Sequence, residues 1–206
     1  MAYSIHARRG LGAAALLLGL ALAGCQTAVA PVEVTRFHGP QEVARSGGFV
    51  IEPAPGLSTD SIEFRTYAGA VSQEMQRAGF TDESALQTLA PSQYVARVGF
   101  SRDVRSPMAA RSPVSVGVGG STGSYGSGVG VGIGINLSGP PKPVVTTTLN
   151  VQIRRRADNQ AVWEGRAITQ AKDGTPAAQP GVAAAKLAAA LFTGYPGKSG
   201  ETITVK

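Results

Sequence analysis

The stretch that decides the fold is Val144-Val-Thr-Thr-Thr-Leu-Asn-Val-Gln-Ile-Arg154, which is followed by Ala161-Val-Trp-Glu-Gly-Arg-Ala-Ile-Thr-Gln-Ala171. In the first of these, Leu149, Val151 and Ile153 alternate with polar residues, which is the two-residue period of a strand with one buried face. The polar residues between the two stretches are typical of a tight turn. The pair therefore predicts an antiparallel hairpin, the clearest β-structure in the sequence.

The rest of the chain predicts further strands and two helices around this hairpin. Strand-like patterns cover residues 32–38, 48–52, 93–104 and 201–205, and helix-like patterns cover 61–78 and 182–192. Phe100 and, in the hairpin, Trp163 fall on the apolar side of their strands, so both are expected in the core. The second helix is rich in alanine, which lets a helix approach a sheet closely. Because a sheet of this kind buries one face under both helices, we expect a two-layer α+β domain with a mostly antiparallel sheet.

The first predicted helix carries an apolar stripe. Residues 58–61 offer side-chain oxygens for its N-cap, and Gly79 is suited to its C-terminal stop. The stripe consists of Ile62, Tyr67, Val71, Met75 and Ala78. We expect this stripe to face the core, although the same spacing would also suit a partner-binding face.

Residues 106–143 form a glycine-rich insert between two predicted core strands. Apolar residues alternate with glycine or serine in two runs, which contain Val114, Val116 and Val118 and then Val129, Val131, Ile133, Ile135 and Leu137. Three interpretations fit: a flexible, partly disordered excursion, a hairpin that lays its Val/Ile face on the domain or on a partner, or a transmembrane hairpin completed by oligomerisation. A phosphate-binding loop does not fit, because no Gly-Lys-Ser/Thr follows the glycines.

The N-terminus has the features of a secretory signal. Arg8 and Arg9 precede an apolar run over residues 11–22, and the run ends in Leu22-Ala-Gly-Cys25. The run is shorter than the roughly 20 apolar residues that a membrane-spanning helix requires. The tetrad resembles the bacterial lipobox, so we expect residues 1–24 to be a cleaved signal peptide and Cys25 to be the lipidated first residue of the mature protein. An ordinary signal peptide with an incidental cysteine is the alternative.

The lipobox resemblance implies a membrane anchor on Cys25. Its thiol would carry a diacylglyceryl group through a thioether, and the new amino terminus would carry a further acyl chain such as palmitate. At ~0.8 kcal/mol per buried CH₂ group, two or more chains hold a protein stably. Gln26 is not the aspartate linked to inner-membrane retention, which favours the periplasmic face of the cell outer membrane. We therefore expect a lipidated tether and an edge strand over 25–47, followed by a domain over 48–205.

Composition excludes several classes of function. Without residues 1–24 the net charge falls from +6 to +4, and no basic stripe with interleaved aromatic residues is present, so we expect no nucleic-acid partner. Cys25 is the only cysteine, so its acylation would leave no thiol for a disulfide, catalysis or a metal. His38 would be the only histidine of the mature chain, and no Gly-x-Ser-x-Gly elbow accompanies it. We therefore expect no catalytic residue, metal or cofactor, and we place His38 at the surface or a sheet edge.

A few short features remain as candidate sites. Arg154, Arg155 and Arg156 form the densest basic run, which suits either an anionic surface or a solvated turn. Asp82 and Glu83 are adjacent carboxylates, which are usually solvated after a helix end rather than acting as an acid pair. The other candidate interaction residues are those of the second apolar run of the insert, Val129, Val131, Ile133 and Ile135.

Several stretches taken in order resemble the DUF4136 family of bacterial lipoproteins, a domain of unknown function. These stretches are the lipobox, Phe49-Val-Ile-Glu-Pro53, Phe64-Arg-Thr-Tyr67, Arg77-Ala-Gly-Phe80, Tyr94-Val-Ala-Arg-Val98, Ala161-Val-Trp-Glu-Gly-Arg166 and Phe192-Thr-Gly-Tyr-Pro196. The resemblance covers most of residues 48–197. Gln93 stands where the family usually has a small polar residue, and the glycine-rich insert is heavier than in the family. The resemblance implies an envelope location and this fold, and it implies no reaction.

These features together predict a non-enzymatic lipoprotein that acts as an interaction or envelope-assembly module. Its partners would be the membrane, through the lipid anchor, and an envelope protein. The alternative is an oligomeric export or pore subunit that inserts its glycine-rich hairpin. A cell-wall hydrolase is a third hypothesis, which would depend on His38. The sequence leaves the oligomeric state open.

Overall fold

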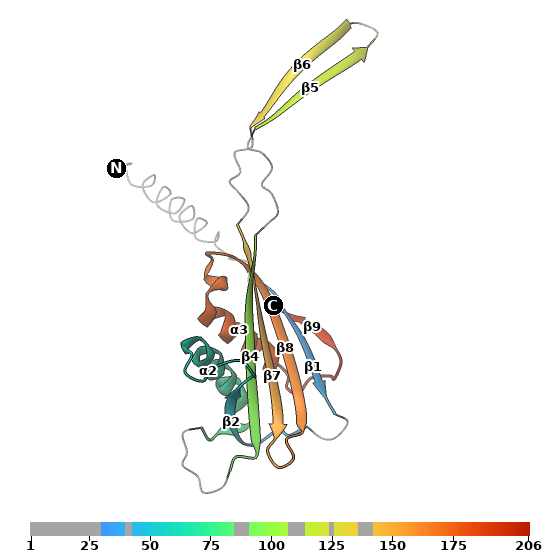
Figure 1. Ribbon diagram of the computed structural model, residues 1–206. Coiled ribbons are helices and arrows are strands. Elements are labelled where there is room, and N and C mark those ends of the chain that lie inside the picture. The colour runs from blue at the N-terminus through green and yellow to red at the C-terminus, as the bar shows by residue number, and fades with distance from the viewer. Residues whose placement is uncertain (1–29, 40–42, 85–90, 107–113, 124–125, 136–141) are drawn as a thin grey trace, which may run out of the picture.

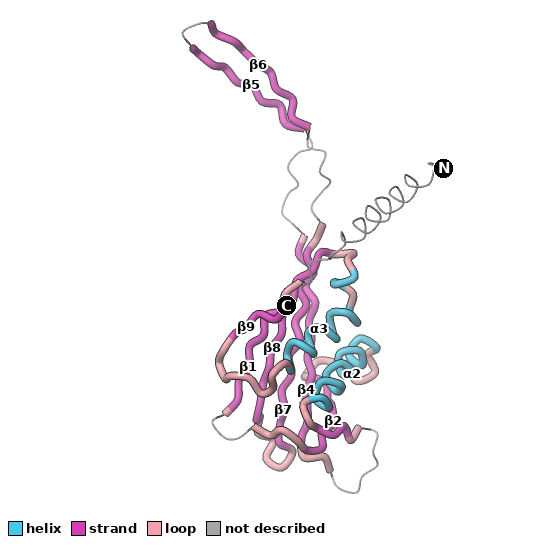
Figure 2. The backbone as a smooth tube through the Cα atoms, turned by 180° about the vertical axis from the view of Figure 1, so that it is seen from behind, coloured by secondary structure: helices cyan, strands magenta, loops and turns pink. Residues whose placement is uncertain are grey.

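The computed structural model describes residues 30–39, 43–84, 91–106, 114–123, 126–135 and 142–206; the predicted signal peptide, Cys25 and parts of the insert lie outside these ranges. One large sheet dominates the molecule, and both helices lie on the same face of it (Figure 1, and from behind in Figure 2). The strands of this sheet are β1 (Val32–His38), β2 (Gly47–Pro53), β3 (Phe80–Asp82), β4 (Tyr94–Arg105), β7 (Val144–Arg155), β8 (Ala161–Lys172) and β9 (Thr202–Val205). The helices are α2 (Ile62–Arg77) and α3 (Pro180–Phe192), with a short 3-10 helix η1 (Pro176–Ala178) before α3.

The seven strands follow the order β3-β2-β4-β7-β8-β1-β9. The pairings of β4 with β7, β7 with β8, β8 with β1 and β1 with β9 are antiparallel, whereas β2 pairs in parallel with β3 and β4. The predicted hairpin lies in the middle of the sheet as β7 and β8, and its Leu149, Ile153 and Trp163 are fully buried. The α+β class, the mostly antiparallel sheet and the two helices on one face are confirmed.

Strand β1 does not lie at the edge of the sheet. It pairs with β8 along its whole length and, over residues 32–35, with β9 on its other side. The prediction of an edge strand within 25–47 is therefore wrong, because the short strand β9 adds one more row of backbone hydrogen bonds outside β1. Strand β3 was also not predicted, since three residues are too few to show a period.

Helix α2 begins at a serine cap and ends at a glycine. The Phe64 N–H donates to Ser61 Oγ at 3.3 Å, which satisfies one of the free donors of the first turn. After the helix, Gly79 has a φ of +107°, a conformation that favours glycine. A Cβ atom at Gly79 would also lie 2.6 Å from the Arg45 carbonyl oxygen, so both conformation and space require glycine at this stop.

The buried face of α2 differs from the predicted stripe at its first member. Ile62 is 76% exposed, and Phe64 is buried in its place. Ile62 lies five residues before Tyr67, which is about 140° around a helix of 3.6 residues per turn, whereas Phe64 lies three residues before it. Tyr67, Val71 and Met75 are fully buried as expected.

Helix α3 approaches the sheet closely at Gly165 of β8. A Cβ atom at this position would lie 2.4 Å from the Trp163 ring and 2.7 Å from Leu191 Cδ1, so no larger residue fits without displacement. Four alanines of this helix are buried, Ala183, Ala184, Ala188 and Ala190. Small residues on both elements therefore allow the close packing that the alanine-rich sequence predicts.

Tyr67 of α2 joins the helix to β4. Its ring stacks on Phe100 with the centroids 4.3 Å apart and the planes within 7°. The side chain is fully buried, and its hydroxyl has no hydrogen-bond partner in the described part of the chain. Burial, together with the charge of Glu63, raises the pKa of Tyr67 to about 12, so the group is neutral at physiological pH.

Replacing Tyr67 by phenylalanine is expected to raise the free energy of unfolding by about 1 kcal/mol, because an unpaired buried hydroxyl is removed without loss of the ring. Urea denaturation of the two proteins measures the change. Tyr195→Phe is the matched comparison with the opposite sign, since the Tyr195 hydroxyl donates to the Ala44 carbonyl at 3.1 Å. A loss of stability in Tyr67→Phe would contradict the prediction.

The insert contains the strands β5 (Val114–Gly123) and β6 (Gly126–Ile135), which pair with each other in a separate two-stranded sheet. Figure 1 draws this pair beyond the ends of β4 and β7. The choice among the three interpretations of the insert stays a prediction. None of the helices in the described ranges is both long enough and apolar enough to cross a membrane.

Candidate interaction surfaces

Two of the three consecutive arginines form hydrogen bonds within the turn between β7 and β8. Arg154 donates to Asn159 Oδ1 at 2.8 Å and to Gln152 Oε1 at 2.7 Å. Arg155 pairs with the Asp158 carboxylate at 2.6 Å. Asn159 has a φ of +55°, so these bonds hold a turn that reverses the chain through a left-handed residue.

Arg156 fastens the same turn to the segment before β4. Its guanidinium donates to the Ser92 carbonyl and to Ser92 Oγ, both at 3.0 Å, and its backbone N–H donates to the Gln93 carbonyl at 2.9 Å. All three arginines thus have a structural role. Their use as a binding site for an anionic surface stays a prediction.

The register of β5 and β6 pairs the valines of β5 with apolar residues of β6. The facing pairs are Val114 with Ile135, Val116 with Ile133, Val118 with Val131, and Gly120 with Val129. The positions between these pairs hold only glycine or serine. Along this β5–β6 ribbon, residues 114–123 and 126–135, pairs that contain valine or isoleucine therefore alternate with pairs of small residues up to Val129.

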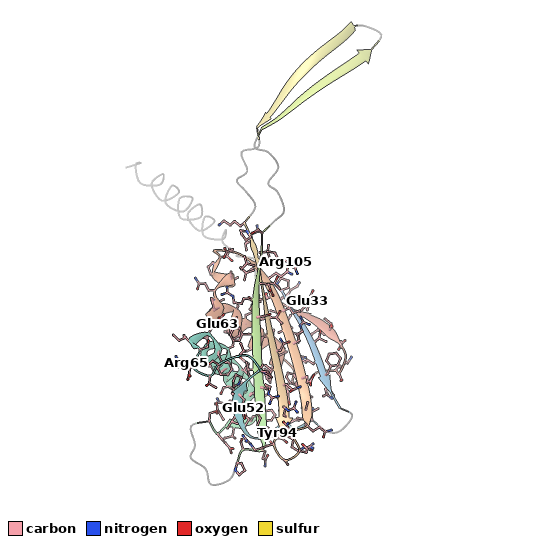
Figure 3. All side chains as sticks on the ribbon, viewed as in Figure 1. Glu33, Glu52, Glu63, Arg65, Tyr94 and Arg105 are labelled. Atoms are coloured by element: carbon pink, nitrogen blue, oxygen red, sulfur yellow. The ribbon has the colours of Figure 1, made fainter. Side chains whose placement is uncertain are left out.

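We call the turn between β7 and β8 that contains Arg156 and is held by Arg154 and Arg155 the arginine turn. The arginine turn and the insert that contains the β5–β6 ribbon leave the large sheet at opposite ends. Arg105 at the end of β4 pairs with Val144 at the start of β7, and the insert leaves the sheet here. Tyr94 at the start of β4 pairs with Arg155 at the other end. Figure 3 shows Arg105 and Tyr94 at these two ends. The structure therefore does not bring the two sets of candidate interaction residues together.

A shallow groove of about 350 Å³ lies on the sheet face opposite the helices. Arg97, Gln152, Glu164 and Phe37 line it and form one row across β4, β7, β8 and β1. Gln152 Nε2 donates to Glu164 Oε1 at 2.5 Å, and Phe37 is 54% exposed. This groove was not predicted from the sequence. The signal that could have indicated it is the row of polar residues on the outer side of the hairpin, but the strand order that aligns them with Phe37 is not visible in the sequence.

His38 is half-buried at the end of β1, and its ring contacts backbone carbonyls. Nδ1 lies 3.0 Å from the Gly39 oxygen and Nε2 lies 3.2 Å from the Gly197 oxygen. Within the described ranges no carboxylate forms an ion pair with it, and no group of three or more His, Cys, Asp and Glu residues could hold a metal ion. These contacts position the ring near the C-terminal turns.

Asp82 and Glu83 do not form an acid pair. The Ser72 hydroxyl donates to Asp82 Oδ2, and the Ser84 N–H donates to Asp82 Oδ1 at 2.8 Å. Glu83 instead lies over Gly48, whose missing side chain leaves room for the carboxylate. Burial by itself would raise the pKa of Asp82, but the hydrogen bonds from Ser72 and Ser84 outweigh it and hold the pKa below the ordinary 3.8.

Asp82 is therefore expected to contribute to acid unfolding. Because its folded pKa is depressed, its stabilisation is complete above the ordinary pKa of 3.8 and is lost as the pH falls through the lower folded pKa. In Asp82→Asn, the fall in unfolding free energy between neutral pH and pH values below 3.8 should be smaller than in the wild type. Urea denaturation at both pH values measures it. Ser72→Ala, which removes one donor, should also reduce the pH dependence, and an unchanged dependence in both variants would contradict the assignment.

The side chains of the closing stretch Phe192-Thr-Gly-Tyr-Pro196 pack around Trp163 in the core. Phe192 stacks on the Trp163 ring with the centroids 5.3 Å apart, and Tyr195 lies tilted at the same distance. Trp163 Nε1 donates to the Pro196 carbonyl at 3.0 Å. Phe80 meets Tyr195 edge to face at 5.8 Å. Phe192 and Tyr195 of the closing stretch and Trp163 of the hairpin arm, which belong to the stretches that resemble the family, therefore build part of the core.

Comparison with known proteins supports the same family. The family described as "Domain of unknown function (DUF4136)" matches residues 44–197. An uncharacterized protein of Zymomonas mobilis subsp. mobilis is 33% identical over 217 residues, which cover 87% of this chain and 82% of the relative.

Two solved structures have weaker similarity. A PDZ domain protein from Parabacteroides distasonis matches 94% of this chain at 10% identity with a TM-score of 0.46, and this chain spans 42% of that chain. The PelC dodecamer from Paraburkholderia phytofirmans matches 79% of this chain and 95% of its own at 13% identity with a TM-score of 0.37.

The family match covers most of the chain and includes nearly all of the core. The protein therefore belongs to the DUF4136 family.

Proposed function

We propose that the protein is a lipoprotein of the cell outer membrane, held on its periplasmic face by acyl chains on Cys25, and that it acts as an interaction or envelope-assembly module. The observation that carries the proposal is Leu22-Ala-Gly-Cys25 at the end of a short apolar run with arginines before it. Cys25 lies outside the described residues, so this support comes from the sequence.

The attachment of the chain just after Cys25 supports a short tether. The Lys186 ammonium donates to the Ala30 carbonyl, and the Thr169 hydroxyl donates to the Pro31 carbonyl at 3.0 Å. Five residue steps separate Cys25 from Ala30, and a fully extended chain spans at most about 3.6 Å per step. An anchor on Cys25 would therefore keep the domain within about 20 Å of the membrane surface.

The contacts of the side chains that could carry chemistry support a role in interaction rather than catalysis. Trp163 and Tyr195 are committed to core packing, Asp82 to serine hydrogen bonds, and His38 to backbone carbonyls. Within the described ranges these residues form no nucleophile–base–acid set. Binding through exposed surfaces is the activity that this arrangement serves best.

Mass spectrometry of the mature protein from its native membranes tests the anchor. We expect an amino-terminal Cys25 that carries diacylglyceryl and a further acyl chain. Cys25→Ser should lose this modification and should be recovered without detergent. An unmodified amino terminus, or recovery of the wild type from the cytosol, would overturn the proposal.

The β5–β6 ribbon favours a second candidate, an oligomeric export or pore subunit. Its register pairs valines of β5 with valine or isoleucine of β6, and strands of 10 residues are near the length that a membrane-crossing strand requires. Deleting residues 114–135 separates the two candidates. Loss of a detergent-stable oligomer would support the pore subunit, whereas an unchanged monomer that no longer crosslinks to an envelope protein in intact cells would support the interaction module.

A further inference from the structure

The tether and the insert leave the large sheet at the same end. Arg105 pairs with Val144, and Val144 pairs with Lys172, so the ends of β4 and β8 and the start of β7 form one row. Val32 at the start of β1 pairs with Thr169, three residues inside that row. Figure 1 shows the starts of β1 and β7 and the end of β4 on the same side of the molecule. We call this side the tether end.

Basic side chains outnumber acidic ones at the tether end. Four exposed basic residues surround it, Arg105 and Lys172 in the terminal row, Lys142 before β7 and Lys206 after β9. The carboxylates there are Asp103, Asp173 and Glu33 at the start of β1, and none of them forms an ion pair with any of the four. We call these four residues the basic rim.

Exposed apolar side chains lie beside the basic rim. Val104 of β4 is 61% exposed and Val182 in the first turn of α3 is 46% exposed, and these are two of the four large apolar side chains exposed in the described part of the chain. Val104 directly precedes Arg105. Basic side chains that flank exposed apolar ones are the composition of surfaces that bind an anionic membrane interface.

We propose that the basic rim docks on anionic phospholipid headgroups, so that the tether end faces the bilayer. This inference rests on the proposed anchor at Cys25, which would hold the rim close to the membrane. When the anchor holds the domain close to the membrane, each ammonium or guanidinium group of the basic rim is attracted to the negative charge of the lipid headgroups. This attraction is screened by salt. The docked domain would point the arginine turn away from the membrane, toward a partner, and would place the end of β4 and the start of β7, between which the insert lies, at the bilayer.

The test uses the native, processed protein reconstituted into vesicles of phosphatidylcholine with or without phosphatidylglycerol. A fluorophore is attached at Val104→Cys or, as a control at the other end, at Ala157→Cys, and quenching by nitroxide-headgroup lipid is measured. Flotation of the protein with the vesicles measures separately whether the anchor attaches the protein to the membrane. We expect the probe at position 104 to be quenched several-fold more strongly than the probe at 157, and only in vesicles that contain phosphatidylglycerol.

Two charge variants with the same net charge complete the test. The rim variant carries Arg105→Glu, Lys142→Glu, Lys172→Glu and Lys206→Glu, and the control variant carries Arg45→Glu, Arg65→Glu, Arg166→Glu and Lys198→Glu. We expect the rim variant to lose the quenching at position 104 and the control variant to keep it. Two outcomes in protein that floats with the vesicles would overturn the docking but leave the anchor intact. One is equal quenching of the probes at positions 104 and 157, and the other is undiminished quenching at position 104 in the rim variant. Self-quenching that rises with protein density would assign the rim to a second copy of the chain, and failure to float would overturn the anchor and the docking together.

Discussion

Replacing Arg36 by alanine is expected to lower the free energy of unfolding by about 3 kcal/mol or more, because a buried set of charge-assisted hydrogen bonds is lost. Arg36 of β1 is 4% exposed. Its Nε donates to the Leu191 carbonyl at 2.9 Å, and Nη2 donates to the carbonyls of Ala190 and Thr193 at 3.0 and 2.8 Å. The last carbonyls of a helix have no partner within the helix, and the end of its dipole favours a cation. Without Arg36 these carbonyls at the end of α3 would remain poorly paired.

Arg166→Ala is the matched control for this experiment. Arg166 lies opposite Thr35, so it is adjacent to Arg36 across β1 and β8, but it is exposed on the other sheet face. Its loss should change stability by no more than about 0.5 kcal/mol. Arg36→Lys should fall between the two, since an ammonium keeps the charge but lacks the planar fork of donors. Urea denaturation followed by circular dichroism measures all three, and equal losses in Arg36→Ala and Arg166→Ala would contradict the role assigned to Arg36.

Arg36 also shows which part of the fold could be predicted from sequence. The period of β1 places it on the same face as Val32 and Val34, and local alternation is sufficient to predict both the strand and that face. Its acceptors lie more than 150 residues away in α3, and nothing local indicates them. The sequence therefore predicts the strand and the face on which Arg36 lies, but the hydrogen-bond acceptors of its guanidinium are known only from the tertiary structure.

The wrong prediction of an edge strand has the same cause, because local patterns do not show pairing between distant parts of the chain. The hairpin of β7 and β8 could be predicted because its partners are close in sequence and its alternation is regular. The order of the other strands depends on distant pairings, such as β1 between β8 and β9, which place a predicted edge strand inside the sheet. Ile62 was assigned to the buried stripe because it is apolar, although its angular position excludes it.

The candidate sites follow this division as well. The arginine run is visible in the sequence, but its use in a turn depends on Asp158, Asn159 and Ser92, and only the first two are local. The tether end is invisible in the sequence, because its basic residues come from four separate places in the chain. Surfaces assembled by topology thus need the structure, whereas the predicted lipobox is a continuous motif that can be recognised in the sequence alone.

Replacing Trp163 by alanine is expected to destabilise the domain by about 4 kcal/mol, the typical loss for truncation of a buried large aromatic side chain. Trp163 is fully buried, and its ring fills the space between the sheet and the rings of Phe192 and Tyr195. Gly165 lies directly beneath that ring and has no side chain that could move into the cavity. The site therefore has little capacity to collapse, and the loss should lie toward the high end of the range.

Trp163→Phe distinguishes the contribution of the aromatic ring from that of the Nε1 hydrogen bond. Phenylalanine keeps most of the aromatic contact but loses the hydrogen bond from Nε1 to the Pro196 carbonyl, so we expect a loss of about 1–2 kcal/mol. Because Trp163 is the only tryptophan, its emission in the wild type should shift to longer wavelength on unfolding, with the same midpoint as the circular dichroism. The variants lack this probe, so circular dichroism alone is used for them. A loss below 1 kcal/mol in Trp163→Ala would mean that Phe192 and Tyr195 repack without it, and the aromatic cluster would then not be what secures α3 to the sheet.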